Sequence, residues 1–173
     1  LQDSWNLAGG NVWNGTAAWH AIDPDASSDQ LLMSPSISLP NDELPLTLQF
    51  YHRQSIERQN ATSCWDAGIL EISTDGGSQW VQVDESRLQT DPYNGTIGNG
   101  NPLSGQRGWC GDPQDWTRSV VDLSAWQGQS VQFRFRLASD SSVGRPEGWR
   151  IDDIRVQSCP SSLVILQDSF EAP

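Results

Sequence analysis

Short stretches in which hydrophobic and polar residues alternate recur along the chain, and turn-forming residues separate them. Alternation with a period of two is typical of half-buried β-strands. Helical periodicity is nearly absent, and a single short helical turn is predicted over 121–127. Many short strands punctuated by Gly and Pro indicate an all-β sandwich or barrel. The predicted strands cover residues 31–33, 36–39, 46–52, 67–73, 80–83, 119–122, 130–138 and 149–157.

Three of these strands are regular enough for their faces to be assigned. Apolar positions 46, 48 and 50 share one face of the strand 46–52, and positions 131, 133, 135 and 137 share one face of the strand 130–138. This pattern predicts antiparallel strands with one face in the core and the other in water. In the last strand the apolar positions shift by one residue at Asp152 and Asp153, which predicts a β-bulge there.

Residues 73–80 read Ser-Thr-Asp-Gly-Gly-Ser-Gln-Trp and lie between two alternating apolar runs. An Asp-Gly turn in this position is the strongest short-range signal for a β-hairpin. The spacing of Ser73, Asp75, Gly77 and Trp80 resembles the Asp-box, a hairpin motif of sialidases and many secreted proteins. The Asp side chain bonds backbone amides and Gly supplies positive φ, so the motif serves the turn and indicates no reaction.

The chain is strongly acidic, with a net charge of -12 over 173 residues and no lysine among its ten basic residues. A surface of this sign repels phosphate backbones and anionic lipid headgroups, so we expect neither a nucleic-acid partner nor a membrane surface. An acidic surface attracts cations instead. No apolar run reaches the roughly 20 residues that a membrane span requires, and the first residues do not resemble a secretory signal. We expect either that a signal was removed or that this is a module of a longer chain.

The three cysteines bear on the cellular compartment. Cys64 and Cys110 both lie in loop-like sequence beside tryptophans, which predicts a disulfide between them in an oxidising compartment. Cys159 then has no predicted disulfide partner. The alternative, three unpaired thiols, stays open because spacing alone does not determine pairing.

Residues 85–116 carry Gly, Asn and Pro without a sustained period, which predicts one long irregular loop. The opening Leu-Gln-Asp-Ser-Trp at 1–5 is echoed by Leu-Gln-Asp-Ser-Phe at 166–170. We expect one domain over residues 1–158, followed over 159–173 by a tail or the start of a further module. The second copy of the motif has an alternative role, as a strand beside the first copy in the same domain.

Several short motifs occur in one order along residues 5–156: Leu32-Met-Ser34-Pro35, Leu48-Gln-Phe50-Tyr-His52, Gly68-Ile-Leu-Glu-Ile72 with the Asp-box, Asn101-Pro102-Leu103, Val121-Asp122-Leu123-Ser124, Phe133-Arg134-Phe135-Arg136 and Gly148-Trp149-Arg-Ile151-Asp152-Asp153-Ile154. This order resembles the MAM-like jelly-roll modules of secreted bacterial proteins, found beside immune-inhibitor-A-type and fungalysin-type metalloproteases. The resemblance implies a two-sheet antiparallel jelly-roll β-sandwich with an accessory role beside other domains of the same secreted or cell-surface protein. Only Cys159 matches the cysteine pattern of eukaryotic MAM modules, so no disulfide pairing is carried over.

Catalytic motifs are missing from the sequence. A hydrolytic zinc site needs two neighbouring histidines and a glutamate, whereas this chain has only His20 and His52, for which we expect packing roles. No G-x-S-x-G elbow or phosphate-binding glycine loop occurs. A glycoside hydrolase stays open as an alternative, because two carboxylates suffice for it and their separation depends on the fold.

A calcium site fits the acidic loops better. Asp23, Asp25 and Asp29 lie in a turn-rich segment, and Ca²⁺ prefers six to eight oxygen ligands. Jelly-roll modules often bring their first and last strands together at a structural cation, so Asp3, Asp152 and Asp153 are predicted to join this site. The alternative is that these aspartates cap turns and solvate loops.

Trp65 and Trp109 are the sequence neighbours of Cys64 and Cys110, and Tyr93 and Trp116 lie in the long segment 85–116. We predict that Trp65, Tyr93, Trp109 and Trp116 form an exposed platform for a polysaccharide or a cell-surface protein. The alternative is that they pack the long loop onto the sandwich. The sequence as a whole therefore predicts a non-catalytic, Ca²⁺-stabilised accessory or binding module of a larger secreted protein, with a purely structural spacer as the alternative.

Overall fold

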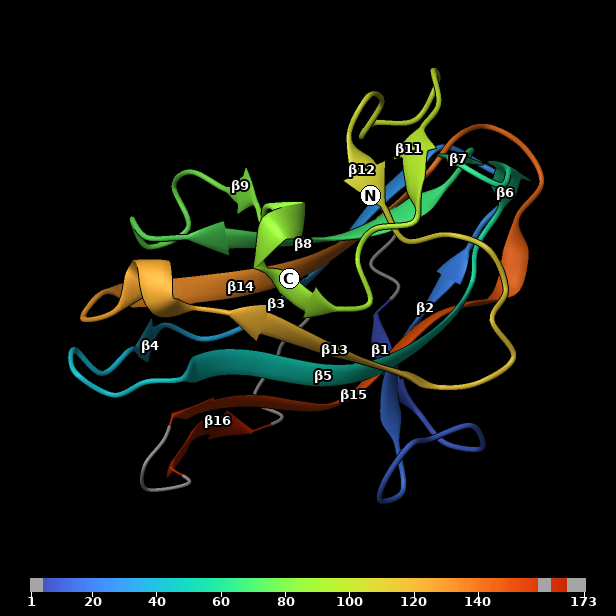
Figure 1. Ribbon diagram of the computed structural model, residues 1–173. Coiled ribbons are helices and arrows are strands. Elements are labelled where there is room, and N and C mark those ends of the chain that lie inside the picture. Colours follow the sequence, from blue (N-terminus) through green and yellow to red (C-terminus); the bar gives the residue numbers. More distant parts are fainter. Residues whose placement is uncertain (1–4, 159–162, 168–173) are drawn as a thin grey trace.

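The computed structural model describes residues 5–158 and 163–167, with side chains described for the first range. Two antiparallel sheets pack face to face, and a small third sheet lies at one end of them (Figure 1). The described residues form strands and two short 3₁₀ helices, with no α-helix among them. The β-sandwich class predicted from the alternation is confirmed, whereas the jelly-roll connectivity in particular stays a prediction.

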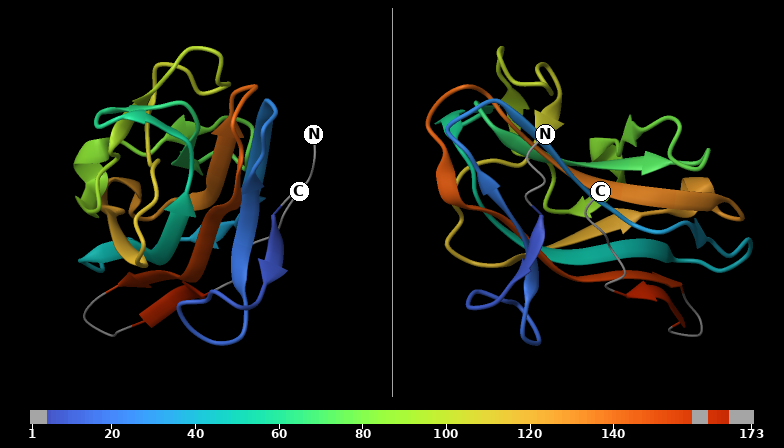
Figure 2. Two further views of the ribbon diagram at one scale, coloured as in Figure 1. Left: turned by 90° about the vertical axis from the view of Figure 1, so that its right-hand side faces the viewer. Right: turned by 180° about the vertical axis from the view of Figure 1, so that it is seen from behind.

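The larger sheet has seven strands in the order β1-β2-β15-β5-β13-β10, and β16 also pairs with β15. The two strands nearest the N-terminus, β1 and β2, form one edge of this sheet (Figure 2). β15 is its longest strand and pairs with β5 along most of its length. The bounds are β1 Asn6–Ala8, β2 Ala18–Asp23, β5 Leu46–Ser55, β10 Leu88–Thr90, β13 Thr117–Asp122, β15 Arg145–Ser158 and β16 Leu163–Gln167.

The second sheet has five strands in the order β3-β14-β8-β9, with β4 pairing the start of β14. A four-stranded sheet, β12-β11-β7-β6, covers one end, and its β7 and β11 run parallel. The bounds are β3 Ser28–Met33, β4 Ile37–Ser38, β6 Arg58–Asn60, β7 Ser63–Cys64, β8 Ala67–Ser73, β9 Val81–Gln82, β11 Gly95–Ile97, β12 Arg107–Gly108 and β14 Ser130–Ser139, with 3₁₀ helices η1 at Glu85–Arg87 and η2 at Ser124–Trp126. No helix in the described part of the chain is long and apolar enough to span a membrane.

The main strands agree with the pattern of alternation. Positions 46, 48 and 50 of β5 and the four alternating apolar positions of β14 are all buried, as predicted. Two differences arise where the apolar period is short or missing. The strands β1, β2, β6 and β7 were not predicted, and the segment 85–116, expected to be one irregular loop, contains η1, β10, β11 and β12. β10 and β11 pair through backbone hydrogen bonds with β13 and β7, which are distant in the sequence, and such pairing leaves little trace in the side-chain pattern.

The Asp-box folds as the predicted hairpin between β8 and β9. The backbone N–H of Gly77 donates to Ser73 Oγ at 2.9 Å, and that of Gln79 donates to Asp75 Oδ1 at 2.9 Å. Gly77 adopts a φ of 87°, which a residue with a side chain rarely adopts. Each polar residue of the motif therefore stabilises the turn, and the motif is architectural.

The strand pattern also predicts that Trp80, Trp126 and Trp149 lie inside the fold, and these three tryptophans differ in their observed burial. Trp149 is fully buried, as predicted. Trp80 is only half-buried, and the Arg134 guanidinium lies 4.5 Å from its ring centroid. Trp126 is also half-buried on the margin of the core, near Arg87. Both residues cover an edge of the sandwich because they belong to turns that close it rather than to central strands.

The predicted bulge at Asp152 and Asp153 is confirmed. The pairing of β15 with β5 shifts by one residue between Asp152 and Arg155, and Asp153 has a φ of 53°. The bulge lies where the pairing of β15 with β2 ends and its pairing with β16 begins. β16 shows that the strand expected in the repeated motif forms within this same sheet. The domain boundary at residue 158 stays a prediction, and residues 1–4, 159–162 and 168–173 lie outside the described residues.

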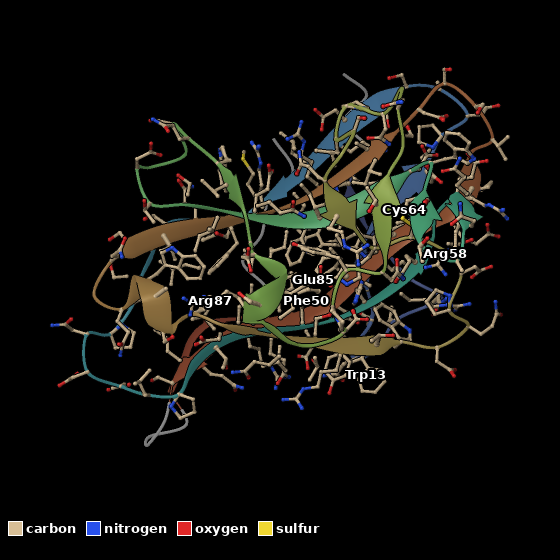
Figure 3. The ribbon with its side chains drawn as sticks, turned by 45° about the horizontal axis from the view of Figure 1, so that its top comes forward. Trp13, Phe50, Arg58, Cys64, Glu85 and Arg87 are labelled. Atoms are coloured by element: carbon tan, nitrogen blue, oxygen red, sulfur yellow. A yellow bond between two sulfur atoms is a disulfide. The ribbon has the colours of Figure 1, made fainter. Side chains whose placement is uncertain are left out.

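An aromatic cluster fills the interior between the two main sheets. Phe50 lies in it (Figure 3), with its ring centroid 4.9 Å from that of Phe135 and 6.0 Å from that of Trp109. Trp149 contacts both Trp109 and Phe135 from the neighbouring strand β15. All four are completely buried. Dense packing of this kind leaves no room for added volume.

Gly68 on β8 provides the first test of this packing. A Cβ atom at this position would lie 2.6–2.8 Å from three ring atoms of Trp149, which is itself fully buried. We expect Gly68→Ala to lower the free energy of unfolding by about 1–3 kcal/mol in urea titrations, the usual range for overpacking. Gly9→Ala is the matched control, because its Cβ would meet only the Thr16 carbonyl at 3.4 Å. Equal stability of the two variants would contradict the packing described.

The small sheet is joined by a disulfide between Cys64 and Cys110, as predicted from the sequence (Figure 3). The two Cα atoms are 5.9 Å apart and both cysteines are fully buried. A buried disulfide is consistent with an oxidising, extracellular compartment. It ties β7 to the segment after β12 and so orders much of the region 85–116.

Candidate functional site

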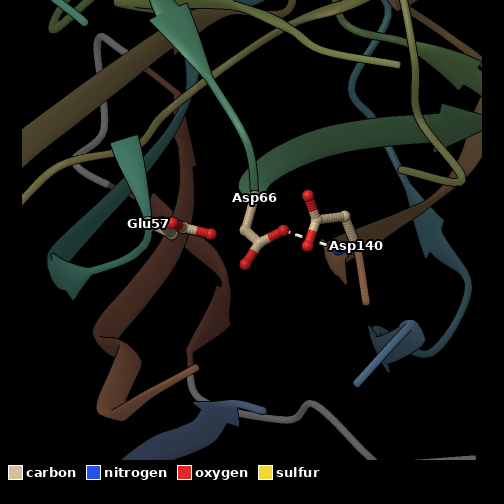
Figure 4. A group of neighbouring side chains, drawn as sticks. All are labelled: Glu57, Asp66 and Asp140. Atoms are coloured by element: carbon tan, nitrogen blue, oxygen red, sulfur yellow. Dashed lines mark hydrogen bonds between the residues drawn. The ribbon is translucent and has the colours of Figure 1, made fainter. Parts of the chain in front are cut away.

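Four acidic side chains meet at the end of the sandwich near the small sheet. Asp23 ends β2, Glu57 lies between β5 and β6, Asp66 lies between β7 and β8, and Asp140 follows β14. Oxygen atoms of Glu57, Asp66 and Asp140 lie within 4.8 Å of one another (Figure 4). We call these four residues the carboxylate cluster. Its members come from both main sheets and from their connections, so the folded sandwich alone brings them together.

Backbone hydrogen bonds hold the cluster in place. The N–H of Glu57 donates to Asp23 Oδ2 at 3.1 Å, and the N–H of Asp140 donates to Asp66 Oδ1 at 2.6 Å. The side-chain amide of Asn101 donates to the Ala138 carbonyl at 2.8 Å and reaches Asp66 Oδ1 at 3.5 Å. Each of the two buried aspartates thus has one oxygen bound to the protein.

The remaining oxygens of the cluster have no such partner. Asp23 Oδ1, Asp66 Oδ2 and Glu57 Oε2 are buried and accept no hydrogen bond from an N–H or hydroxyl group of any described residue, and the Asp23 and Asp66 carboxyls can bond each other only when one of them is protonated. Burial, followed by the neighbouring Asp66 carboxylate, raises the pKa of Asp23 to about 8. Burial also raises the pKa of Asp66 to about 6, and it raises the pKa of Glu57. Buried anionic oxygens without partners are costly, so this arrangement favours either protonation or a bound cation.

The donor set fits a hard divalent cation. All four side chains offer carboxylate oxygens, the ligands that Ca²⁺ prefers, and no histidine or cysteine belongs to the group. Asp23 is 1% exposed and Asp66 is 0% exposed, so a sugar ring cannot reach their oxygens. The cluster therefore suits a structural ion better than the acid and base of the glycoside hydrolase that the sequence left open.

Comparison with known proteins places this fold in a family. The chain matches the family described as Reelin subrepeat B over residues 13–157, which is most of its length. The chain belongs to the Reelin subrepeat B family. It is also similar to Bacillopeptidase F of Bacillus subtilis (strain 168), with 30% identity over 128 residues. That match covers 74% of this chain and 7% of the relative, so the Reelin subrepeat B domain corresponds to a small part of a longer protein. Both matches fit an accessory β-sandwich, and membership of the MAM-like modules in particular stays a prediction.

Of the six aspartates predicted to bind calcium, only Asp23 lies in the carboxylate cluster. Asp3 lies outside the described residues, and Asp25 is exposed on the loop after β2. Asp29 forms an ion pair with Arg136, its Oδ1 lying 2.7 Å from Nε. Proximity in the sequence did not predict proximity in the fold, because Asp29 is already on β3, whose pairing with β14 directs it toward Arg136.

The two aspartates of the bulge also have other partners. Asp152 Oδ2 accepts hydrogen bonds from the backbone N–H groups of Trp13 at 2.8 Å and Asn14 at 3.0 Å. Asp153 forms an ion pair with Arg155. The contacts of Asp152 match the turn-capping part of the alternative given for these aspartates, in which they cap turns and solvate loops, although both residues are buried. In the Reelin subrepeat B domain the bulge anchors the loop between β1 and β2 to the seven-stranded sheet.

The predicted aromatic platform does not form as expected. Tyr93 is 2% exposed and Trp109 is 0% exposed, because both pack into the interior aromatic cluster with ring centroids 4.5 Å apart. They fix the long segment onto the sandwich, which was the alternative role. Trp65 and Trp116 are half-buried and keep part of their surface open. The four residues therefore share no exposed surface.

Sequence reasoning missed three members of the cluster, Glu57, Asp66 and Asp140. Asp66 directly precedes the predicted strand 67–73, Asp140 lies two residues after the predicted strand 130–138, and Glu57 lies five residues after the predicted strand 46–52. The signal that could have found them is the presence of acidic residues near the ends of several strands. Strands of facing sheets can end at the same side of a sandwich, which would bring such residues together. The sequence alone does not say which strand ends coincide.

A serine, a histidine and an aspartate also meet in the interior, but not as a catalytic triad. His52 Nε2 lies 2.6 Å from Asp91 Oδ2 and 3.1 Å from Ser119 Oγ, so both partners share one ring nitrogen. The Trp149 indole N–H donates to Nδ1 at 3.0 Å, which assigns the ring proton to Nε2. A triad needs its serine and aspartate at opposite nitrogens. His52 is completely buried and has the packing role that the sequence predicted.

Proposed function

We propose that this Reelin subrepeat B domain is a non-catalytic accessory module of a larger secreted protein, held in its folded shape by Ca²⁺ at the carboxylate cluster. The relative Bacillopeptidase F is more than ten times longer than the matched region, which supports a module that works beside other domains. The Cys64–Cys110 disulfide supports a secreted location. The partners proposed are the other domains of the same protein.

The observation that carries the proposal is the set of three unpartnered oxygens on Asp23, Glu57 and Asp66. When bound, Ca²⁺ supplies positive charge and coordination to oxygens that the protein leaves unsatisfied. Asp23, Glu57, Asp66 and Asp140 are the residues that would hold it. Because they come from four separate segments, the ion would join both sheets at one end of the sandwich and stabilise the whole domain.

A purely structural spacer is the second candidate. It is favoured by the burial of Tyr93 and Trp109, which removes half of the surface first predicted to bind a partner. Trp65 and Trp116 remain as partly exposed residues for contact with a polysaccharide or a cell-surface protein. A ligand for the isolated domain would separate a binding module from a spacer.

Calcium is expected to raise the melting temperature of the isolated domain. At a free concentration 100 times its Kd, one ion adds about 2.7 kcal/mol to the free energy of unfolding, which is several degrees for a domain of this size. Differential scanning calorimetry in chelator and in excess CaCl₂ at pH 8 measures the difference. Asp66→Asn should remove most of it, whereas Asp25→Asn, on an exposed loop residue, should leave it unchanged. Identical melting temperatures in chelator and calcium would contradict the proposal.

A further inference from the structure

The arginines of this acidic domain are distributed unevenly between paired and unpaired sites. The chain has 22 acidic residues for ten arginines, so carboxylate partners are abundant. Five arginines form ion pairs, and among the described residues the other five do not. Three of those five, Arg53, Arg145 and Arg150, line one surface cavity of about 460 Å³. The charge of Arg145 also acts on Glu57 of the carboxylate cluster. Arg53 and Arg150 are therefore the two cations of this cavity whose lack of a carboxylate partner among the described residues requires an explanation.

Two of these arginines lie directly opposite each other. Arg53 on β5 and Arg150 on β15 are cross-strand neighbours, an arrangement that is unfavourable for like charges. Burial and then the charge of Arg53 lower the pKa of Arg150. On the next strand, His20 lies opposite Arg150, and burial and then Arg150 lower the pKa of His20. A row of like-charged or chargeable side chains thus crosses three strands of the outer sheet face.

Polar groups surround this row. Gln54 contributes to the cavity wall, but it alternates with Arg53 and is 3% exposed, so its side chain belongs to the inner face of β5 and is not among the ligand-facing groups. Asn11 and Gln114 contribute further side-chain amides to the lining. Asp112 and Glu147 also line the cavity, so three arginines face two carboxylates. The small positive excess suits one carboxylate at a time and does not suit a polyphosphate or a densely sulfated chain.

An exposed aromatic surface adjoins the cavity. Trp13 stacks on Tyr51 with ring centroids 4.1 Å apart and planes 11° apart, and Tyr51 is two residues from Arg53 on the same face of β5. Trp13 is 47% exposed although its backbone is fixed by Asp152. One face of the indole is covered by Tyr51, so the other is free to pack against a ligand. A fixed and exposed indole is a common platform for the apolar face of a sugar ring.

The same loop connects the two features. The carbonyl of Asn11 accepts a hydrogen bond from Arg150 at 3.4 Å, and its side-chain oxygen accepts one from the Trp116 indole at 3.2 Å. The loop that carries Asn11 and Trp13 therefore borders both the arginine row and the aromatic surface. Together they combine a carboxylate-binding pair, neutral amides for hydroxyl groups, and a flat apolar face.

We propose that the outer face of the seven-stranded sheet binds a carboxylated glycan, with the carboxylate of a uronic-acid unit between Arg53 and Arg150 and a sugar ring on Trp13. The proposal rests on the proposed role as an accessory module and gives it a ligand class. This site differs from the aromatic platform predicted from the sequence. Of the four residues of that platform, only Trp116 lies near the proposed glycan surface, where its indole bonds Asn11. An acidic peptide would satisfy the arginines but would not need the indole, so the aromatic surface favours the glycan.

Isothermal titration calorimetry with an oligoglucuronate tests this proposal, and its fully methyl-esterified form is the matched neutral ligand. We expect the acid to bind and the ester to bind at least about tenfold more weakly, since a charge-assisted pair contributes about 1.4 kcal/mol or more. Arg53→Gln and Trp13→Ala should each weaken binding of the acid by about tenfold. Arg58→Gln is the control, because Arg58 lacks an ion pair but bonds the Asn94 carbonyl away from this cavity. Arg53→Gln also relieves the repulsion by Arg150, so its melting temperature should not fall.

Three results would overturn the proposal. The first is equal binding of acid and ester, and the second is binding that Arg53→Gln leaves unchanged. The third is binding of poly-glutamate that depends on Arg53 but not on Trp13, which would assign the surface to an acidic peptide. If no glycan binds while calcium still raises the melting temperature, the glycan site is refuted and the calcium-stabilised module stands. If calcium has no effect on the melting temperature but oligoglucuronate binds, the calcium site is refuted and the glycan site stands.

Discussion

In the presence of chelator, the domain is expected to become less stable as the pH rises from about 5 to about 8. Most proteins are stabilised or unaffected over this interval, so the direction is diagnostic. Its origin is the carboxylate cluster, where the pKa of Asp23 is raised to about 8 and that of Asp66 to about 6. In the unfolded chain both groups ionise near pH 3.8.

The sign follows from proton binding in the two states. Between the unfolded and folded pKa values the folded protein holds protons that the unfolded chain has released, so raising the pH favours unfolding. The stabilisation is complete below about pH 4 and is lost as the pH passes through about 6 and then about 8. Because both aspartates are buried, we expect a loss of several kcal/mol. His20 opposes it modestly below pH 6.5, since its own pKa is lowered.

Calcium should reverse this dependence. The ion binds the ionised cluster and competes with its protons, so its stabilising effect grows with pH. Urea unfolding at several pH values, with chelator and with CaCl₂, measures both slopes. Asp23→Asn should flatten the slope in chelator, and Asp25→Asn should retain it. The same slope in chelator and in calcium would show that the cluster does not bind the ion.

Loss of the Cys64–Cys110 disulfide is expected to lower the free energy of unfolding by about 4 kcal/mol. The two cysteines are separated by 46 residues, and closing a loop of that length restricts the unfolded chain substantially. In the folded state the disulfide ties β7 to the segment after β12, next to Gly95, whose missing side chain leaves room for the Cys64 sulfur.

The wild-type protein in reducing agent should show this decrease, and the double variant Cys64→Ala/Cys110→Ala should show a decrease at least as large. The reduced protein serves as the control for the cavity that the smaller alanine side chains leave, since it keeps both sulfur atoms. Equilibrium unfolding in urea gives both values. If the reduced protein retained the full stability of the oxidised form, the small sheet would be held by its backbone pairing alone.

The central strands and the hairpin were predictable because their determinants are local. Side-chain alternation in β5 and β14 identifies the buried face without knowledge of any partner strand. The Asp-box encodes its turn in neighbouring residues, and the phase shift at Asp152–Asp153 marks the bulge. In each case the residues that fix the conformation lie within a few positions of it.

The carboxylate cluster could not be predicted because it depends on which strand ends coincide. Asp140 is 74 residues from Asp66 in the sequence, and pairing between β14 and β8 places the two together. Trp109, in contrast, was wrongly predicted to be exposed. Its loop-like neighbourhood suggested exposure, but the disulfide at Cys110 and a hydrogen bond from its indole to the Asp91 carbonyl hold it in the core. Long-range constraints of these kinds leave no periodic pattern in the sequence.

A crystal structure of the domain grown with CaCl₂ at pH 8, with anomalous data collected, is the most direct measurement. We expect one anomalous peak in contact with oxygen atoms of Asp23, Glu57, Asp66 and Asp140, including the three that have no hydrogen-bond partner. A cluster that contains only water, or a protonated Asp23 packed against Asp66 with no ion between them, would contradict the calcium-stabilised module.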